Sequence, residues 1–523
     1  MKILSIAFFL CVVTCTSTAQ SKVFKEVSED ISSEMKIITQ DDALVGYLLF
    51  TQLEKTSADS FNYKISLMDE NLNDIGAVNF REENLDLEAV SFEQDVLCLA
   101  YLKSNINGKE FKNKKEYNNF DGKNSIFTQF LTLDGKIIKT NTLGIQLQSD
   151  NYEIWASPKN KFTYHGNLKH GVQLKNIFQK GFVCFFGDKD GCNLITYDLA
   201  GKEGWKKSFA EKQAYSLLTS KTDIYLLEKS MEKYYEGGYY LAGYNFEDGH
   251  TYDRITLNDN EGNSLKVLGF GKDPLTGIPY VSGNIIDPEK GNNFSSGKEL
   301  ARGPYTGIFS MDINGHSKKE IKKTFIYWNN GSQKPIVSKR GYLSGSKSYN
   351  RMSTSFRDFN GNTYFVGSEF IKKPKIGAIV ASVITAPLFV VPLYILGAAG
   401  TTKCKVTDAS LMKINPKGVL SFENSIPCNN SKFVKGIQLF SKINSDRGYY
   451  GVENPDTKAN YIVADDSKNI MIYSVNKKKV VRTIPHKDGK ISTQVFPAKE
   501  GHIMVVEKNK KEKYTRLSIE ALD

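Results

Sequence analysis

The sequence predicts an all-β fold, and within that class a β-propeller of about eight blades. Short β-type runs recur at a mean interval of about 65 residues. Turns in which Asp or Asn is followed closely by Gly recur with them. The composition agrees: the 523 residues are 40% hydrophobic and 24% charged with 14 Pro, which excludes wholesale disorder. The net charge of +11 is spread over the whole chain and forms no single basic block.

The first nineteen residues have the pattern of a secretory signal peptide. Lys2 supplies the positive start, residues 3–13 are apolar, and Ser17 and Ala19 are the small residues that a signal peptidase requires. We expect cleavage before Gln20 and export to the periplasm, the outer membrane or the cell surface. The apolar run is too short for a membrane anchor, which needs ~20 residues. A lipoprotein route through Cys15 is the second alternative.

The repeat extends over nearly the whole mature chain, so we predict one propeller domain over residues 20–523. The recurring β-type runs are residues 45–52, 96–102, 181–186, 223–227, 279–285, 363–370, 448–453 and 502–507. Three or four strands per repeat, arranged radially, make a propeller blade. A seven-bladed ring is the alternative count. A β-sandwich followed by other domains would not repeat one strand and turn formula along the chain.

The predicted turns and the two chain ends complete this scheme. The turn glycines Gly135, Gly201, Gly262 and Gly315 are spaced by about 60 residues, and a further turn lies at 415–418. The last repeat, 502–523, ends where its outer strand would begin. Residues 22–27 form a free β-type run at the mature N-terminus. Pairing of these two segments would close the ring without an unpaired edge.

An apolar insertion interrupts the sixth repeat between residues 372 and 403. Residues 376–400 carry no charge and are flanked by lysines on both sides. Pro387 and Pro392 divide the run into short pieces, so a helical hairpin is expected here and a single membrane crossing is not. Three roles remain open: packing over the propeller, re-entrant insertion into lipid, or docking into a partner. The candidate contact residues are Ile379, Val383, Leu388, Phe389, Val390, Leu393 and Ile395.

Five cysteines remain after removal of the signal peptide. Cys184 and Cys192 flank the predicted turn at 185–191, and Cys404 and Cys428 flank the one at 415–418. Both pairs are candidate disulfides in an oxidising compartment. Buried free thiols are the alternative. Metal ligation is disfavoured, because no Cys-x-x-Cys occurs and the six His are scattered.

The sequence contains no catalytic or cofactor-binding motif in a strand and helix context that would support it. Nucleophile elbow, Walker loop, zinc-protease and dinucleotide patterns are missing from the sequence. Acidic neighbours such as Asp41 and Asp42 would point to opposite faces of a strand, so they make no acid and base pair. We therefore expect no cofactor, no metal and no catalytic residue. The short lysine tracts at 112–115, 477–479 and 508–513 are read as solvated loops and strand edges, and no nucleic acid is expected.

One aromatic group is a candidate ligand site. Two pairs of tyrosines surround the glycines at 237–238, and rings at a propeller rim can stack on sugars or peptide side chains. The alternative is packing between blades. The four residues are Tyr234, Tyr235, Tyr239 and Tyr240.

The turn 198–202 and the following Trp205 resemble those of propellers whose outer strand carries a Trp docked between blades, including quinoprotein-type propellers. The whole pattern, a signal peptide followed by loose Asp/Asn and Gly repeats, is similar to uncharacterised secreted propeller-like proteins of bacteria. This resemblance implies a fold and a compartment, and no activity.

The sequence thus favours an exported, non-catalytic binding or scaffold propeller at the bacterial cell envelope. Its partner would be an envelope protein or a glycan, and membrane contact through 376–400 is one of the three open roles of that segment. The alternative is an envelope hydrolase that acts on glycans at the central opening of the propeller.

Overall fold

The computed structural model describes most of the chain outside the N-terminal nineteen residues and several connections. The described residues are 20–25, 32–40, 43–57, 60–149, 162–168, 171–209, 214–229, 238–287, 305–328, 336–338, 342–344, 348–374, 402–427, 433–435, 449–454, 458–465, 468–486, 491–499, 501–509 and 511–522.

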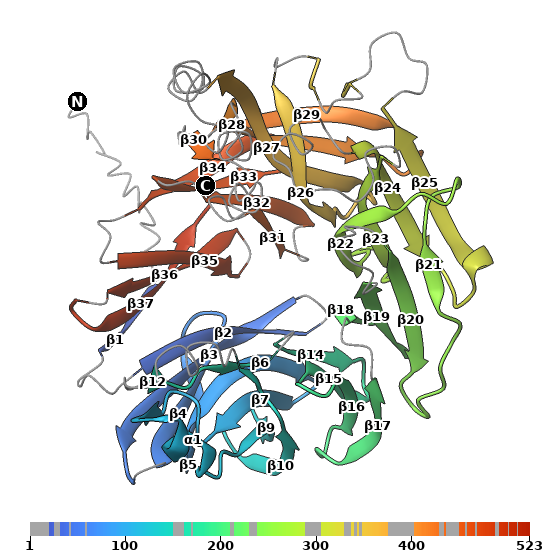
Figure 1. The fold of residues 1–523 in the computed structure, drawn as a ribbon. Coiled ribbons are helices and arrows are strands. Elements are labelled where there is room, and N and C mark those ends of the chain that lie inside the picture. The colour runs from blue at the N-terminus through green and yellow to red at the C-terminus, as the bar shows by residue number, and fades with distance from the viewer. Residues whose placement is uncertain are drawn as a thin grey trace, which may run out of the picture.

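Eight antiparallel sheets of four principal strands form a ring of blades (Figure 1). Within each blade we call the strands A to D from the centre outward. Blade 1 contains β2 (Ser32–Gln40), β3 (Ala43–Lys55), β4 (Ser60–Asp69) and β5 (Asp74–Glu83). Blade 2 contains β6 (Leu85–Glu93), β7 (Val96–Ser104), β9 (Asn124–Thr132) and β10 (Ile137–Ile145). Blade 3 contains β14 (Val172–Ile177), β15 (Gly181–Gly187), β16 (Cys192–Asp198) and β17 (Glu203–Phe209). Blade 4 contains β18 (Ala214–Thr219), β19 (Asp223–Lys229), β20 (Tyr239–Asn245) and β21 (Ile255–Leu257).

The second half of the ring repeats this plan. Blade 5 contains β22 (Leu265–Lys272), β23 (Pro279–Ile286), β24 (Tyr305–Ile313) and β25 (Ile321–Tyr327). Blade 6 contains β26 (Tyr349–Arg357), β27 (Thr363–Pro374), β28 (Thr402–Ile414) and β29 (Leu420–Ile426), and β30 (Phe433–Lys435) also pairs with β28. Blade 7 contains β31 (Tyr449–Asn454), β32 (Ala459–Asp465), β33 (Asn469–Ser474) and β34 (Lys479–Pro485). Blade 8 contains β35 (Ile491–Pro497), β36 (His502–Asn509), β37 (Tyr514–Ala521) and β1 (Gln20–Lys25).

Short elements lie between and after the strands of blade 2. They are β8 (Glu110–Phe111), α1 (Lys114–Asn118), β11 (Gln148–Ser149), β12 (Phe162–Thr163) and β13 (Gly166–Asn167). A 3-10 turn at Lys318–Glu320 lies between β24 and β25.

The predicted ring closure is confirmed. Strand β1 pairs antiparallel with β37, from Gln20 opposite Ile519 to Lys25 opposite Tyr514. The first residue after the predicted cleavage site is therefore also the first residue of the closing strand. Because the N-terminus supplies the outermost strand of the last blade, the blade is completed by both ends of the chain.

In the described part of the chain, eight apolar clusters fill the seams of the ring, one between each pair of neighbouring blades. The cluster that joins the last blade to the first packs Leu49 and Met68 against Met504 and Leu517, all at most 1% exposed. Burial removes apolar surface from water at each seam, and a fully buried Leu or Met contributes ~1.5–3 kcal/mol. Eight seams of this kind make one closed domain.

The seventh predicted run and one of the predicted turns, that of Gly262, are assigned differently in the structure. Residues 448–453 overlap strand A of their blade, whereas the other seven runs are B strands. Gly135, Gly201 and Gly418 occupy C–D turns with positive φ, as the sequence predicts. Gly262 instead connects blade 4 to blade 5, and Gly315 lies in the long C–D connection of blade 5. The sequence did not distinguish C–D turns within a blade from connections between blades, because both contain Asp or Asn followed closely by Gly.

Trp205 illustrates how the turns join neighbouring blades. This residue of β17 donates its indole N–H to the carbonyl of Phe246 in blade 4, at 2.7 Å. Gly249 lies beneath the ring with φ +69°, and a Cβ there would come within 2.9 Å of the indole. The interblade docking that the resemblance implied is therefore present at this seam.

Candidate functional site

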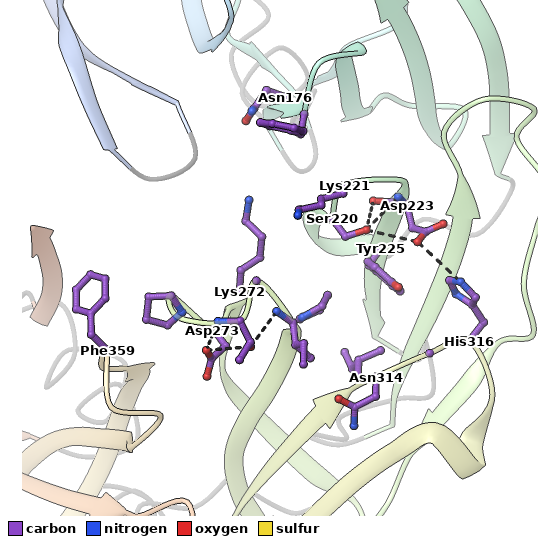
Figure 2. Close-up of a pocket in the computed structure, with 18 residues that line it drawn as sticks. Asn176, Ser220, Lys221, Asp223, Tyr225, Lys272, Asp273, Asn314, His316 and Phe359 are labelled. Atoms are coloured by element: carbon purple, nitrogen blue, oxygen red, sulfur yellow. Dashed lines mark hydrogen bonds and ion pairs between the residues drawn. The ribbon is translucent and has the colours of Figure 1, made fainter. Parts of the chain in front are cut away.

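Four successive A–B turns surround a pocket of about 620 Å³ on one face of the ring. We call this face the A–B face. The contributing turns follow β14, β18, β22 and β26, and the C–D connection of blade 5 adds one further wall. The A strands line the centre of the ring (Figure 1), so the pocket that their turns form, drawn in Figure 2, lies at the inner rim.

The wall from blade 5 is a rigid turn built around Asp273, whose side chain is 7% exposed. Its Oδ1 accepts hydrogen bonds from the backbone N–H of Leu275 at 3.0 Å and of Thr276 at 2.9 Å. The Thr276 hydroxyl donates to the same oxygen at 3.0 Å. These bonds fix the turn that presents Pro274 and Ile278 to the pocket.

Arg357 fastens this turn to blade 6. Its guanidinium lies 3.3 Å from Asp273 Oδ2 and also contacts the Asp312 carboxylate. It donates to Ser310 Oγ at 3.0 Å and lies over the Tyr280 ring, 4.5 Å from the centroid. The Arg357 side chain is only 8% exposed, so this network is a buried tie between two blades.

A second carboxylate, Asp223 of β19, is also saturated with contacts. Tyr252 donates to its Oδ1 at 2.8 Å and Thr222 donates to its Oδ2 at 2.7 Å. His316 Nε2 lies 3.8 Å from Oδ2, and the imidazole stacks on the Tyr252 ring at 3.6 Å. Burial, followed by the hydrogen bond to Asp223 and the charge of that carboxylate, raises the pKa of Tyr252, so its hydroxyl remains a donor.

Two lysines project into the same space without an anionic partner. Figure 2 shows the chains of Lys221 and Lys272 reaching toward the open middle of the pocket from neighbouring turns. Within the part of the chain that the structure describes, no carboxylate forms an ion pair with either ammonium group. Among the described residues, both ammonium groups are therefore without a counterion in contact.

Glu93 supports the wall from blade 3. This carboxylate is 0% exposed and accepts from Asn176 Nδ2 at 2.7 Å and from the backbone N–H of Gln179 at 3.0 Å. The bonded turn carries Phe178, whose ring is 38% exposed and lines the pocket beside Asn176. Glu93 thus acts as a positioning residue for an exposed aromatic.

The arrangement is suited to binding more than to proton transfer. The two pocket carboxylates already accept several hydrogen bonds, and His316 Nδ1 is buried without a hydrogen-bond partner. No group of three or more His, Cys, Asp or Glu among the described residues could hold a metal ion.

Of the four candidate tyrosines, Tyr239 and Tyr240 lie among the described residues. Tyr239 is 3% exposed and belongs to the seam between blades 4 and 5. Tyr240 lies under the Arg254 guanidinium, at 4.2 Å. Tyr239 thus packs between blades, whereas the contact of Tyr240 lies within blade 4, and a ligand role for the tyrosines stays a prediction. Tyr234 and Tyr235 lie outside the described residues.

The first candidate disulfide does not match the strand register. Cys184 lies opposite Ile195, and Cys192 lies opposite Gly187. Cys184 packs with Cys98 in the seam between blades 2 and 3, whereas Cys192 packs in the seam between blades 3 and 4. The prediction placed the two residues at facing positions, but the strands keep pairing up to Gly187, which separates them. In the second pair, Cys404 lies opposite Lys372 and Val434, and Cys428 is outside the described residues.

The apolar segment and its seven candidate contact residues also lie outside the described residues. Its two ends leave blade 6 side by side, because Pro374 pairs with Thr402. The prediction that both flanks belong to one blade is confirmed. In the described ranges, no helix is long and apolar enough to cross a membrane.

Sequence reasoning did not identify the pocket residues Lys221, Lys272, His316, Phe178 and Phe359. The Asp-Pro-x-Thr-Gly sequence at 273–277 is a strong turn signal and could have located one wall. No local signal shows that this turn meets three others.

No protein-family model matches the sequence, and no curated protein matches it. Among solved structures, the chain is similar to a quinohemoprotein alcohol dehydrogenase from Comamonas testosteroni, at 9% identity over 95% of this chain and 78% of that one, with a TM-score of 0.41. It is similar to the WD40 domain of SCAP from fission yeast, at 9% identity over 93% and 98%, with a TM-score of 0.37. The Dos1 propeller matches at 8% identity over 83% and 92%, with a TM-score of 0.35. The assignment of the fold rests on the strand pairing of this chain.

Proposed function

We propose that this protein is an exported, non-catalytic binding module of the bacterial cell envelope and that it holds its ligand in the A–B face pocket. The observation that supports this most directly is the difference in contacts between the acidic and the basic side chains of the pocket. Asp223 and Asp273 are occupied by contacts within the protein, whereas Lys221 and Lys272 are left for a ligand. The signal-like sequence of residues 1–19 supports export.

A pocket-filling variant tests this proposal. Asn314 is exposed and lines the pocket, so Asn314→Trp would occupy ligand space without removing a fold contact. Asn260 is equally exposed but lies outside the pocket, which makes Asn260→Trp the matched control. Envelope components that co-purify with the wild type are expected to be lost with Asn314→Trp and retained with Asn260→Trp. Equal retention by both variants would refute the pocket as the binding site.

A glycan hydrolase is the second candidate, because Asp223 and His316 do form an acid and histidine pair beside the pocket. Against it, the free nitrogen of His316 is shielded, and Asp223 already accepts from Tyr252 and Thr222. Incubation with envelope glycans separates the two functions. A hydrolase releases soluble fragments in a manner abolished by His316→Ala, whereas a binding module releases none.

We propose membrane contact through the apolar segment 376–400 as an additional attachment. Its flanking strands carry Lys372, Lys373, Lys403 and Lys405 at paired or adjacent register positions, and basic residues favour anionic headgroups. Because Pro374 and Thr402 are paired, the segment can be replaced by a short Gly-Ser linker without separating β27 from β28. The replacement should move the protein from the membrane fraction to the soluble fraction, and unchanged fractionation would refute the attachment.

A further inference from the structure

The charged side chains of the pocket differ in their contacts, and this difference points to the chemistry of its ligand. Of its four charged side chains, the two acids are satisfied by the protein. Asp273 is bound by Arg357 and by two backbone N–H groups, and Asp223 is bound by Tyr252 and Thr222. An additional cation would find few free lone pairs here.

The two ammonium groups are in the opposite situation. Lys221 comes from the A–B turn of blade 4, and Lys272 comes from the end of β22 in blade 5. They reach into one cavity from different blades (Figure 2), and neither has a carboxylate partner among the described residues. Two like charges in a partly enclosed space repel each other, and an anionic ligand would relieve that repulsion.

The rest of the lining is mixed: Asn176, Ser220, Thr276, Asn314 and His316 are polar, and a group of apolar side chains lies among them. Phe178 and Phe359 lie on the sides contributed by blades 3 and 6, and Pro274, Ile278 and Pro279 lie between them. A ligand that fills this cavity must offer apolar groups as well as negative charge. A free inorganic anion offers no such group, whereas a peptide side chain offers several, and an anionic sugar, whose ring could stack on a Phe, is compared with the peptide in the test below.

From this combination we propose that the pocket binds an acidic peptide segment, in which two carboxylates pair with Lys221 and Lys272 and an apolar side chain packs between Phe178 and Phe359. The inference rests on the proposed binding function. Each lysine is a single point charge without a fixed fork, so two lysines on different blades suit two separate anionic groups such as the carboxylates of a peptide. A volume of about 620 Å³ suits a few side chains of an extended peptide.

The test uses the mature full-length protein and three probes measured by isothermal titration calorimetry. The first is a short peptide in which two Glu flank a Phe-Leu pair. The second is the same peptide with Gln in place of each Glu, and the third is an oligogalacturonate, an anionic glycan. We expect binding of the Glu peptide only, weakened by added salt because the contacts are ionic.

Two double variants test whether the pocket lysines are the groups that bind the peptide carboxylates. Lys221→Gln with Lys272→Gln removes the pocket charges, whereas Lys202→Gln with Lys206→Gln removes the same charge from exposed positions of blade 3. The pocket pair should weaken peptide binding about tenfold per lysine, equivalent to ~1.4 kcal/mol each, and the control pair should leave it within twofold.

Each of the following results would overturn the inference. Equal binding of the Gln peptide would show that charge is not recognised, and preference for the oligogalacturonate would assign a glycan. Unchanged affinity in the pocket pair, or no peptide binding at millimolar concentration, would remove the lysines from the recognition. The proposed function fails separately, when Asn314→Trp retains the envelope components that the wild type binds.

Discussion

Truncation of Arg357 should destabilise the ring and dismantle one wall of the pocket. Arg357→Met keeps the apolar part of the side chain and removes the guanidinium. Asp273, 7% exposed, and Asp312, 24% exposed, would then lose their buried counterion. Ser310 Oγ and Thr363 Oγ1 would also lose a hydrogen-bond donor.

The expected cost follows from these contacts. Removal of one partner of a buried ion pair leaves an uncompensated charge and costs ~3–5 kcal/mol. Loss of the cation–π contact with Tyr280 contributes in the same direction, by ~1–2 kcal/mol when desolvated, and the two effects are not additive. We therefore expect a decrease of ~3–5 kcal/mol in the free energy of unfolding. Urea denaturation followed by far-ultraviolet circular dichroism measures it.

Two further variants control this experiment. Arg81 is exposed and has no such network, so Arg81→Met should change the free energy of unfolding by at most ~0.5 kcal/mol. Adding Asp273→Asn to Arg357→Met removes the stranded charge while retaining a turn acceptor, and should recover part of the loss. If Arg357→Met costs less than ~1 kcal/mol, the network is not the tie between blades that its geometry indicates.

Three other predictions follow from individual contacts. Hydrogen bonds from Ser421, Lys413 and Lys478 outweigh the opposing effect of burial and lower the pKa of Glu423 to about 2. Its contribution to stability should therefore be complete above about pH 5 and lost as the pH falls toward 2. Glu423→Gln should then flatten the acid side of a plot of unfolding free energy against pH, and an unchanged plot would refute this. Burial raises the pKa of the Cys184 thiol to about 12 and that of Cys98 well above its ordinary value, so iodoacetamide at pH 8 should label neither until the protein is unfolded, as read by peptide mass spectrometry. Deletion of residues 20–25 exposes the edge of β37 and should increase protease sensitivity and self-association in light scattering, whereas Val23→Ala, at a 51% exposed position of the same strand, should not.

The ring could be predicted from the sequence because its signals are local and repeated. Each hairpin needs an Asx side chain and a residue at positive φ, as where Asp198 Oδ1 accepts from the Lys202 N–H at 2.7 Å and Gly201 has φ +73°. Repetition of that requirement revealed the period. The free strands at both ends then indicated how the ring closes, which β1 and β37 confirm.

The site could not be predicted in the same way, because its parts are brought together only by the closed ring. Lys221 and Lys272 are separated by a whole blade of sequence, and neither stands in a motif. Arg357 looks like an ordinary strand residue until its partners Asp273 and Asp312, from blade 5, are known. The candidate pairing of Cys184 with Cys192 failed for a related reason. The number of residues between the two cysteines could be read from the sequence. The strand register at Gly187, which decides which residues face each other, could not.

The central claim is that the pocket where four A–B turns meet is the ligand site, and site-directed photocrosslinking tests it most directly. Phe178 lines the pocket and is 38% exposed, while Phe422 of β29 is 39% exposed and lies away from it. Each is replaced in turn by the photoreactive benzoylphenylalanine in the full-length protein, in living cells. A discrete crosslinked species at position 178, missing at position 422 and lost when Asn314→Trp is added, is the predicted result. Equal crosslinking at both positions, or crosslinking at 422 alone, would contradict the account.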